Sequence, residues 1–216
     1  MAGQVITIAQ QKGGAGKTTL AAHLALAWAR ARRVAVIDID PQGSLAAWFR
    51  LRREQADILG PGFEAAAITG WRVSAEVERQ ARSHDIVLID SAPHAETEAR
   101  LAVRASSLVL IPVQPSPMDV WATRATLELA RQERVPALLV LNRVPSRANL
   151  TQTMAAKLAE LGAPVAATQI GNRVALAAAL AEGQGILEAA PGSRAAEEIT
   201  ALAAEVLEHM ASRVAA

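Results

Sequence analysis

The clearest chemical signal in this chain is a segment rich in glycine, lysine and threonine that follows the first apolar run. It reads Gln10-Gln11-Lys12-Gly13-Gly14-Ala15-Gly16-Lys17-Thr18-Thr19. Glycines let a backbone curl so that successive N–H groups point inward at an anion, and a helix that begins directly afterwards adds its positive end. In such a loop Lys17 would reach the β- and γ-phosphates of a nucleotide, and the Thr18 hydroxyl would complete the shell of a Mg²⁺ ion. The residues expected to contact the nucleotide are Gly13, Gly14, Ala15, Gly16, Lys17, Thr18 and Thr19.

The segment departs from two standard patterns. The pattern G-x-x-x-x-G-K-[ST] needs a glycine where this chain has Gln11, which is followed by Lys12. A dinucleotide fingerprint built on Gly14 and Gly16 would need a third glycine where Thr19 stands. An ordinary glycine-rich turn that leads into a helix is the alternative interpretation.

Lysine usage strengthens the phosphate interpretation. Three of the 22 basic residues are lysines (Lys12, Lys17 and Lys157), and two of these fall in this loop. An ammonium group enters a phosphate cradle as a compact point charge, where the broad guanidinium of arginine would fit poorly. The chain therefore uses lysine where a phosphate site requires that shape.

The elements that must position this loop alternate between short apolar runs and longer segments of helical period. The expected strands are Val5–Ala9, Val34–Asp38, Ile86–Asp90, Leu108–Val113, Ala137–Leu141 and Pro164–Ile170. The expected helices are Lys17–Arg30, Ser44–Arg53, Ser74–Ser83, Glu96–Ala105, Asp119–Arg131, Leu150–Leu161 and Ser193–Val214. Nearly continuous apolar runs are typical of parallel strands buried on both faces. The alternation predicts an α/β fold, a doubly wound and mainly parallel sheet flanked by helices, as one domain over residues 1–216 with 59–71 as its most loop-like stretch.

Composition and charge exclude several classes of protein. Hydrophobic residues make up 51% of the chain and charged residues 20%, which favours a buried core over disorder. The net charge of +1 excludes a globally basic nucleic-acid coat protein but not a local basic patch. The absence of cysteine excludes disulfides, thiolate zinc sites and iron–sulfur clusters. The sequence shows no basic leader, membrane-length apolar run or metal-like histidine spacing, so we expect a soluble, cytoplasmic protein.

The loop with its additional lysine resembles the deviant Walker A motif of the ParA/MinD family of dimeric P-loop ATPases, and the resemblance covers nearly the whole chain. The segment Val36–Ser44 is similar to the family's second motif, and Ile86–Pro93 is similar to its Walker B segment. The segments Ile111–Asp119 and Leu141–Arg143 also resemble family segments. Because no N-terminal DNA-reading domain precedes the loop, the chain is most similar to the short ParA partition ATPases.

The resemblance implies roles for single residues. Lys12 matches the signature lysine that crosses the dimer interface to the partner's nucleotide, which couples ATP binding to homodimer formation. Asp40 matches the carboxylate that positions the attacking water, and Asp90 matches the group that holds Mg²⁺ together with Thr18. Asn142 matches a residue that hydrogen-bonds adenine. Taken as plain structural residues, Asp38 and Asp40 would start a turn at the end of their strand, Asp90 would cap the next helix and Asn142 would lie in a turn.

The implied activity is the hydrolysis of ATP to ADP and phosphate with Mg²⁺, in which Lys12, Lys17 and Asp40 are the catalytic residues. Phosphoryl transfer to water depends mainly on positioning and charge neutralisation. We expect a weak intrinsic ATPase that times a switch and is accelerated by a cargo-bound activator protein, ParB-like or equivalent.

The resemblance also implies that the ATP-bound dimer binds non-specific double-stranded DNA, and so associates with the nucleoid, to partition or position a cargo. Arg173 and Arg194 lie in segments similar to the family's DNA-contacting positions, and Arg143 and Arg147 are weaker candidates. Contacts to phosphates alone give sequence-independent, salt-sensitive affinity. The alternative is that these arginines are solvated or ion-paired surface residues. The cargo, whether a plasmid, a chromosome region or a large protein assembly, is left open.

Two competing classes of function make different demands on the sequence. Membrane binding of the MinD type uses a basic amphipathic C-terminal helix, but the polar face of residues 195–216 is mainly acidic. We therefore expect that helix to pack on the sheet and the protein not to bind membranes. A metabolic P-loop phosphotransferase would generally lack the Lys12 feature. The absence of cysteine and tyrosine argues against the iron-protein and tyrosine-kinase relatives.

Overall fold

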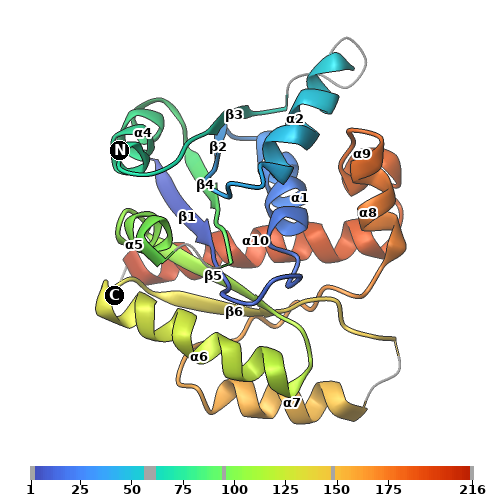
Figure 1. Ribbon diagram of the computed structural model, residues 1–216. Coiled ribbons are helices and arrows are strands. Elements are labelled where there is room, and N and C mark those ends of the chain that lie inside the picture. The colour runs from blue at the N-terminus through green and yellow to red at the C-terminus, as the bar shows by residue number, and fades with distance from the viewer. Residues whose placement is uncertain (1–2, 56–61, 94–95, 147–148, 215–216) are drawn as a thin grey trace.

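A parallel β-sheet forms the centre of the structure, a computed structural model that describes residues 3–55, 62–93, 96–146 and 149–214. The described strands are β1 (Gln4–Ile8), β2 (Val34–Asp38), β3 (Glu64–Ala67), β4 (Ile86–Asp90), β5 (Leu108–Val113) and β6 (Ala137–Leu141). They lie in the order β3-β2-β4-β1-β5-β6, and every pair of neighbours is parallel (Figure 1). The predicted α/β fold with a parallel sheet is thereby confirmed.

Helices cover both faces of this sheet (Figure 1). One face carries α1 (Lys17–Ala29), α2 (Ser44–Glu54), α8 (Val174–Ala181), α9 (Ile186–Ala189) and α10 (Arg194–Val214). The other face carries α4 (Arg72–Ser83), α5 (Glu96–Arg104), α6 (Pro117–Gln132) and α7 (Asn149–Ala159). Successive strand residues alternate between the two apolar cores, as side chains of period two must. In β4, for example, Ile86 and Leu88 pack under α1 and α10, whereas Val87 and Ile89 pack under α4 and α5.

The register of the central strands brings their carboxyl ends to one edge. Ile8, the last residue of β1, pairs with Asp90, the last residue of β4, and Asp90 in turn pairs with Asp38 at the end of β2. In open α/β sheets, ligands bind outside this carboxyl edge. The loop between β1 and α1 therefore lies where two carboxylates emerge from neighbouring strands.

The C-terminal helix α10 packs against the sheet layer, as predicted. Its residues Ile199, Leu202 and Val206 are buried in the core that α1 shares. The indole N–H of Trp28 in α1 donates a hydrogen bond of 3.0 Å to the carbonyl oxygen of Ala203 in α10. Among the described helices, none is both long and apolar enough to cross a membrane.

The prediction of a strand over Pro164–Ile170 is wrong. This segment forms an isolated bridge between Val165 and Leu139, and the N–H groups of Ala167 and Thr168 donate instead to the Glu205 carboxylate of α10, at 2.6 and 2.9 Å. The Glu205 carboxylate thus takes the Thr168 N–H, which a ladder continued from the hydrogen bond between Ala166 and Leu139 would direct to β6.

Three further elements were not predicted. The edge strand β3 lies within the stretch predicted as loop-like, and its alanine-rich sequence carries little strand signal. The short helices α8 and α9 follow the segment that was expected to be a strand, and α9 contains 4 residues. Their small size leaves little room for a helical period to show in the sequence.

Candidate nucleotide-binding site

The loop between β1 and α1 has the backbone of a phosphate cradle. Gly14 and Gly16 have φ angles of 80° and 87°, in the left-handed region that glycine adopts without a steric penalty. A Cβ atom added at Gly13 or Gly14 would meet nothing within 4 Å, so the loop borders open space there. Helix α1 starts with no side-chain cap and no acidic residue in its own first turn, so no residue of that turn neutralises its positive end. These features suit an anion at the start of α1.

The side chain of Lys17 folds back along the same loop. Its Nζ donates a hydrogen bond of 3.1 Å to the carbonyl oxygen of Gln10, the first residue of the loop. Burial lowers the pKa of Lys17, while the charges of Asp90 and Asp40 act to raise it. A desolvated ammonium beside two carboxylates is a suitable binding group for a phosphate that arrives with a divalent cation.

Thr18 and Asp90 form a direct pair at the carboxyl edge of the sheet. The Thr18 hydroxyl donates a hydrogen bond of 2.7 Å to Oδ2 of Asp90, which is buried. Burial raises the pKa of Asp90 to about 7, helped by the nearby charges of Asp38 and Asp40 and opposed by the Thr18 hydrogen bond and by Lys17. Oδ1 of Asp90 is buried without a hydrogen-bond partner among the described residues. A carboxylate with one free oxygen beside a hydroxyl fits a role in the shell of a hydrated Mg²⁺ ion.

The Mg²⁺ ion would enter this site with the nucleotide. Magnesium keeps several waters and is usually held by one or two carboxylates together with substrate phosphates. In the part of the chain that the structure describes, no three carboxylate, histidine or cysteine side chains gather into a ready metal cage. The donor set of Thr18 and Asp90 therefore fits a metal that the phosphates help to hold.

Asp38 and Asp40 have different surroundings although only Ile39 lies between them in the sequence. Asp38 is buried and accepts hydrogen bonds from the backbone N–H groups of Asp40 (3.0 Å) and Ala46 (2.9 Å), so it fixes the turn before α2. Burial raises the pKa of Asp38. Asp40 is half-buried and accepts a hydrogen bond of 2.9 Å from the N–H of Gln42. Both carboxylates thus accept hydrogen bonds from backbone N–H groups between β2 and the first turn of α2, as the structural alternative expects, and Asp40 is the more accessible of the two.

Asn142, the residue directly after strand β6, braces the loop. Its side-chain N–H donates a hydrogen bond of 2.7 Å to the carbonyl oxygen of Ala15, and its Oδ1 accepts from the N–H of Arg143 at 3.0 Å. Both polar atoms of the buried amide are thereby used within the protein. The role predicted for Asn142 in binding adenine stays a prediction.

Lys12 lies against helix α6. Its Nζ forms an ion pair with Oδ2 of Asp119, which is 1% exposed, whereas the Lys12 side chain is 37% exposed. Gln114, in the connection between β5 and α6, donates a hydrogen bond of 2.9 Å to the carbonyl oxygen of Gly14. Sequence reasoning assigned no role to Asp119 or Gln114. The pattern Ser116-Pro117-Met118-Asp119 was readable as a helix start, but the pairing with Lys12 was not.

The two arginines predicted to contact DNA converge on one carboxylate. Arg173 donates two hydrogen bonds to Glu198, from Nε (2.9 Å) and Nη2 (2.5 Å), and Nε of Arg194 lies 3.4 Å from the same carboxylate. Burial acts to raise the pKa of Glu198, but hydrogen bonds from Arg173 and from the N–H of Gly171 outweigh it and lower the pKa. The structure thus gathers Arg173 and Arg194 into one cluster around an ionised glutamate.

The backbone next to Arg143 lies close to the backbone that leads into Arg173. Arg143 has a φ angle of 53°, in the left-handed region, and its side chain is exposed. The next residue, Val144, forms an isolated bridge with Gly171, which is two residues before Arg173. The fourth arginine candidate, Arg147, lies outside the described residues.

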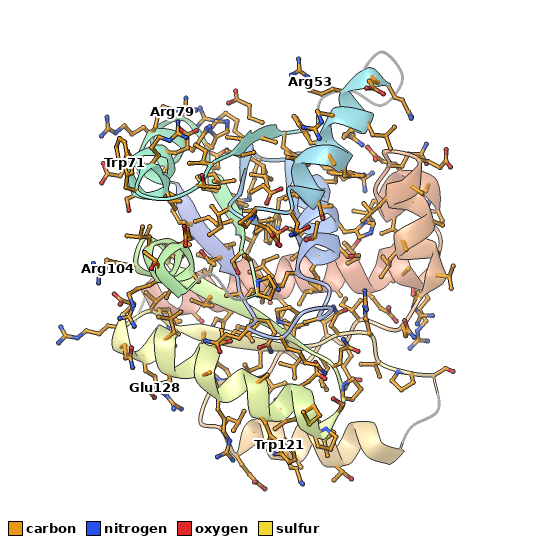
Figure 2. All side chains as sticks on the ribbon, viewed as in Figure 1. Arg53, Trp71, Arg79, Arg104, Trp121 and Glu128 are labelled. Atoms are coloured by element: carbon orange, nitrogen blue, oxygen red, sulfur yellow. The ribbon has the colours of Figure 1, made fainter. Side chains whose placement is uncertain are left out.

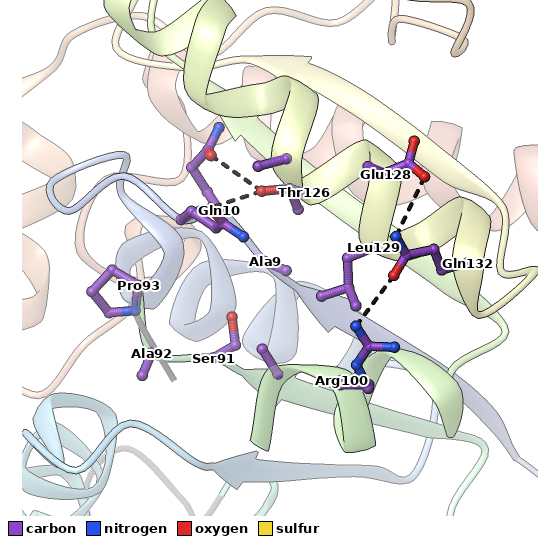
Figure 3. Close-up of a pocket in the computed structure, with 13 residues that line it drawn as sticks. Ala9, Gln10, Ser91, Ala92, Pro93, Arg100, Thr126, Glu128, Leu129 and Gln132 are labelled. Atoms are coloured by element: carbon purple, nitrogen blue, oxygen red, sulfur yellow. Dashed lines mark hydrogen bonds between the residues drawn. The ribbon is translucent and has the colours of Figure 1, made fainter. Parts of the chain in front are cut away.

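A cavity of about 430 Å³ lies beside the loop, between α5 and α6. Figure 3 shows Gln10 and Thr126 joined on one side of it, and Arg100 and Glu128 each joined to Gln132 on the other. Its lining includes Gln10 and Ser91, whereas Lys17, Thr18, Asp40 and Asp90 are not part of it. The cavity is therefore a neighbour of the phosphate cradle and distinct from it.

A parallel sheet, a glycine-rich loop with two lysines and paired carboxylates at the carboxyl edge together define a P-loop nucleotide-binding protein. The chain belongs to the family described as the CobQ/CobB/MinD/ParA nucleotide binding domain, whose model matches residues 6–186. This confirms the resemblance to the ParA/MinD family, among whose members are a chromosome-partitioning ATPase and a cell division ATPase.

Two relatives of similar length match almost the entire chain. The Maintenance of carboxysome distribution protein A of Halothiobacillus neapolitanus is 30% identical over 209 residues, covering 94% of this chain and 95% of that protein. The chromosome-partitioning ATPase Soj of Thermus thermophilus is 33% identical over 235 residues, covering 94% of each.

Solved structures share the fold at lower identity. The ATP complex of McdA from Cyanothece superposes with a TM-score of 0.81 at 19% identity, covering 96% of this chain and 97% of that one. The cell division ATPase MinD of Pyrococcus furiosus gives a TM-score of 0.79 at 20% identity, covering 95% of this chain and 99% of that one.

Proposed function

We propose that this chain is an ATP-switched positioning protein. In this proposal ATP binding drives homodimer formation, the dimer binds non-specific duplex DNA, and hydrolysis stimulated by a cargo-bound protein returns it to a DNA-free state. The observation that carries the proposal is the loop with Lys12 and Lys17 at the sheet edge where Asp40 and Asp90 emerge. The DNA-bound state would associate with the nucleoid.

The hydrolytic step needs little covalent chemistry from the protein. A water oxygen forms a bond to the γ-phosphorus while the bond between that phosphorus and the ADP oxygen breaks, and positioning supplies most of the rate. Asp40, half-buried and more accessible than Asp38, would orient the water. Lys17 and the Thr18–Asp90 pair would hold the phosphates and the Mg²⁺ ion, which neutralises the charge that builds on the leaving oxygen.

The arginine cluster supports DNA binding by the dimer. Arg194 is 77% exposed and Arg173 is 32% exposed, so both guanidinium groups reach the surface beside Glu198. Dimerisation would present two such clusters to one duplex. Contacts with phosphates alone carry no sequence information, which suits a protein that must move over any DNA.

A partner surface is proposed on α6. Trp121 and Met118 are 61% and 60% exposed and lie one turn apart on this helix, directly after the connection that holds the phosphate loop. Exposed tryptophan is a residue type enriched among the dominant contacts of protein interfaces. We infer that the activating protein contacts this part of α6.

The packing of α10 argues against membrane association. Its apolar stripe is buried in the core, and Glu198 and Glu205 bind groups of this same chain. An amphipathic anchor needs a free apolar face and a basic rim. The described residues of α10 offer neither.

Retention on non-specific duplex DNA, at fixed low salt with ATP–Mg²⁺, ADP–Mg²⁺ or no nucleotide, tests the proposal. The protein carries Asp40→Ala to suppress hydrolysis. We expect retention with ATP alone, weakened by added salt and by Arg173→Ala or Arg194→Ala. Equal or absent retention in all three states would overturn the DNA step, and liposomes of anionic lipid would then be tested in the same three states.

A further inference from the structure

The ion pair between Lys12 and Asp119 joins a partly exposed ammonium group to a buried carboxylate. Asp119 is 1% exposed at the start of α6, and the Lys12 side chain that reaches it is 37% exposed. The pair spans 107 residues of sequence, so it ties the phosphate loop to a different element of the fold. The ammonium group is thereby directed toward α6 of its own chain.

Asp119 depends strongly on this lysine. Its Oδ2 also accepts a hydrogen bond from the hydroxyl of Ser116, the residue that caps α6, and its Oδ1 is buried without a hydrogen-bond partner among the described residues. A buried carboxylate that loses its cation is strongly destabilising unless another group replaces the cation. Departure of Lys12 would leave Asp119 with one neutral donor for its charge, so the pair resists opening.

The backbone on both sides of the pair is held as well. Gln114 donates to the carbonyl oxygen of Gly14 in the loop, and Gln10 donates a hydrogen bond of 3.1 Å to the Thr123 hydroxyl in α6. These bonds keep the loop and the first turns of α6 together around Lys12. The position of the ammonium is therefore set by α6.

We propose that Asp119 is a positioning residue that holds Lys12 within its own chain in the resting state and so sets the ATP concentration at which the dimer forms. The inference rests on the proposed function, in which Lys12 must reach the partner's nucleotide. Lys12 cannot serve Asp119 and that nucleotide at once. When only a fraction of molecules has the competent conformation, apparent affinity falls by that fraction. The partner's phosphates must therefore compete with a buried carboxylate for the same ammonium.

The main test replaces Asp119 by asparagine, which keeps the size of the side chain and removes its charge. All proteins carry Asp40→Ala, and dimerisation is followed by light scattering against ATP concentration. We expect Asp119→Asn to lower the ATP concentration for half-maximal dimerisation by about tenfold or more, as release of a charge partner would. Affinity of the monomer for ADP should be unchanged. Ser116→Ala, which removes the cap and the second hydrogen bond but leaves the ion pair, should not lower the threshold.

A double-variant comparison separates positioning from mere stability. Lys12→Ala should abolish the ATP-driven dimer whether or not Asp119→Asn is also present, because the lower threshold depends on the lysine that Asp119 holds. A threshold for Asp119→Asn equal to or above that of the Asp40→Ala parent, or recovery of the dimer when Asp119→Asn is added to Lys12→Ala, would overturn the proposal. If the parent protein stays monomeric at saturating ATP, the proposed function itself fails.

The low lysine content allows a second measurement that needs no change at Asp119. Reductive methylation with ¹³C labels Lys12, Lys17, Lys157 and the amino terminus and preserves their charges. We expect the Lys12 methyl signal to be that of an immobilised ammonium without nucleotide and with ADP, and to move on addition of ATP. A Lys12 signal that matches the exposed Lys157, or that does not respond to ATP while the dimer forms, would contradict the proposal.

Discussion

The side-chain amide of Asn142 donates a hydrogen bond of 2.7 Å to the carbonyl oxygen of Ala15, so the end of β6 supports the phosphate loop. The fit is close, because a Cβ atom added at Gly16 would lie 2.5 Å from the Asn142 Nδ2 atom. Gln114 supports the loop from β5 by its bond to Gly14. The loop is thus braced on both sides of its turn before any nucleotide binds.

Asn142→Ala removes one of these braces. We expect nucleotide affinity to fall about fivefold, since a buried hydrogen bond contributes roughly 1 kcal/mol and its loss leaves the Ala15 carbonyl without this donor. Isothermal titration with ADP and with inorganic tripolyphosphate gives the decisive comparison. If Asn142 is a brace, its loss lowers the affinity for both ligands by the same factor. If it contacts adenine, its loss lowers the affinity for ADP alone. Gln114→Ala is the matched control for a brace that has no adenine role.

Asp40→Ala and Asp38→Ala should fail in different ways. Asp40→Ala should reduce ATP turnover by about 10²-fold or more, as loss of a group that positions the attacking water does, with the free energy of unfolding nearly unchanged. Asp38→Ala deprives the N–H groups of Asp40 and Ala46 of their acceptor, so it should lower the free energy of unfolding by about 1–3 kcal/mol. Steady-state turnover and urea unfolding measure the two effects. Normal turnover in Asp40→Ala would show that Asp40 is not the carboxylate that positions the water.

The sequence allowed the central strands and the phosphate loop to be predicted, because both depend on local pattern. β2, β4, β5 and β6 are continuous apolar runs, and their bounds agree with the prediction. The edge strand β3 reads Glu-Ala-Ala-Ala, which carries no such signal. The segment 164–170 has an apolar pattern, but Glu205 from a distant helix takes two of its backbone donors.

The polar contacts that complete the site were beyond sequence reasoning for a related reason. Asp119 and Asn142 meet the loop across 107 and 127 residues of chain, and no local pattern encodes such a meeting. The motif predicted that Lys12 belongs to a phosphate site. It did not show that a buried carboxylate already binds this lysine. The functional residues could thus be predicted where a local motif defines them. The hydrogen-bond and ion-pair partners of these residues could not, because the tertiary fold brings them in from distant parts of the chain.

Glu198→Gln should strengthen the proposed DNA binding. The carboxylate now neutralises part of the charge of Arg173 and Arg194, and its removal frees both guanidinium groups for phosphates. We expect DNA affinity in the ATP state to rise about threefold to tenfold, with a steeper dependence on salt. Glu197→Gln changes the net charge equally at the exposed neighbouring position and serves as the control. Weaker binding by Glu198→Gln would show that the glutamate orients the arginines toward DNA.

Trp121→Ala should separate basal from stimulated turnover. The side chain is 61% exposed, so its loss should change the free energy of unfolding by no more than about 0.5 kcal/mol. Basal ATPase should stay the same, and stimulation by the activating protein should fall severalfold. Trp71, 83% exposed at the start of α4, is the matched control, and Figure 2 shows the two tryptophans on different parts of the molecule. Equal stimulation of both variants would place the partner elsewhere.

His23 should make stability depend on pH below neutrality. Its Nδ1 accepts a hydrogen bond of 3.1 Å from the N–H of Ile186, so the ring proton lies on Nε2, which is 3.1 Å from the carbonyl oxygen of Leu176. Burial lowers the pKa of His23 to about 4, against an ordinary value of 6.5. Protonation of Nδ1 would break the bond to Ile186, which is a hydrogen bond between α1 and the start of α9.

The direction of this pH dependence follows from whether the folded or the unfolded chain binds the proton. Between pH 6.5 and about 4 the unfolded chain protonates His23 and the folded chain does not, so stability falls as pH is lowered through this window. The contribution is complete above pH 6.5, and its loss by about pH 4 amounts to roughly 3 kcal/mol. Urea unfolding of the wild type and of His23→Gln across this range isolates the effect, because Asp90 and the other carboxylates titrate in both proteins. The difference in the free energy of unfolding between the two should shrink as pH falls from 6.5 toward 4, and a constant difference would contradict the assignment.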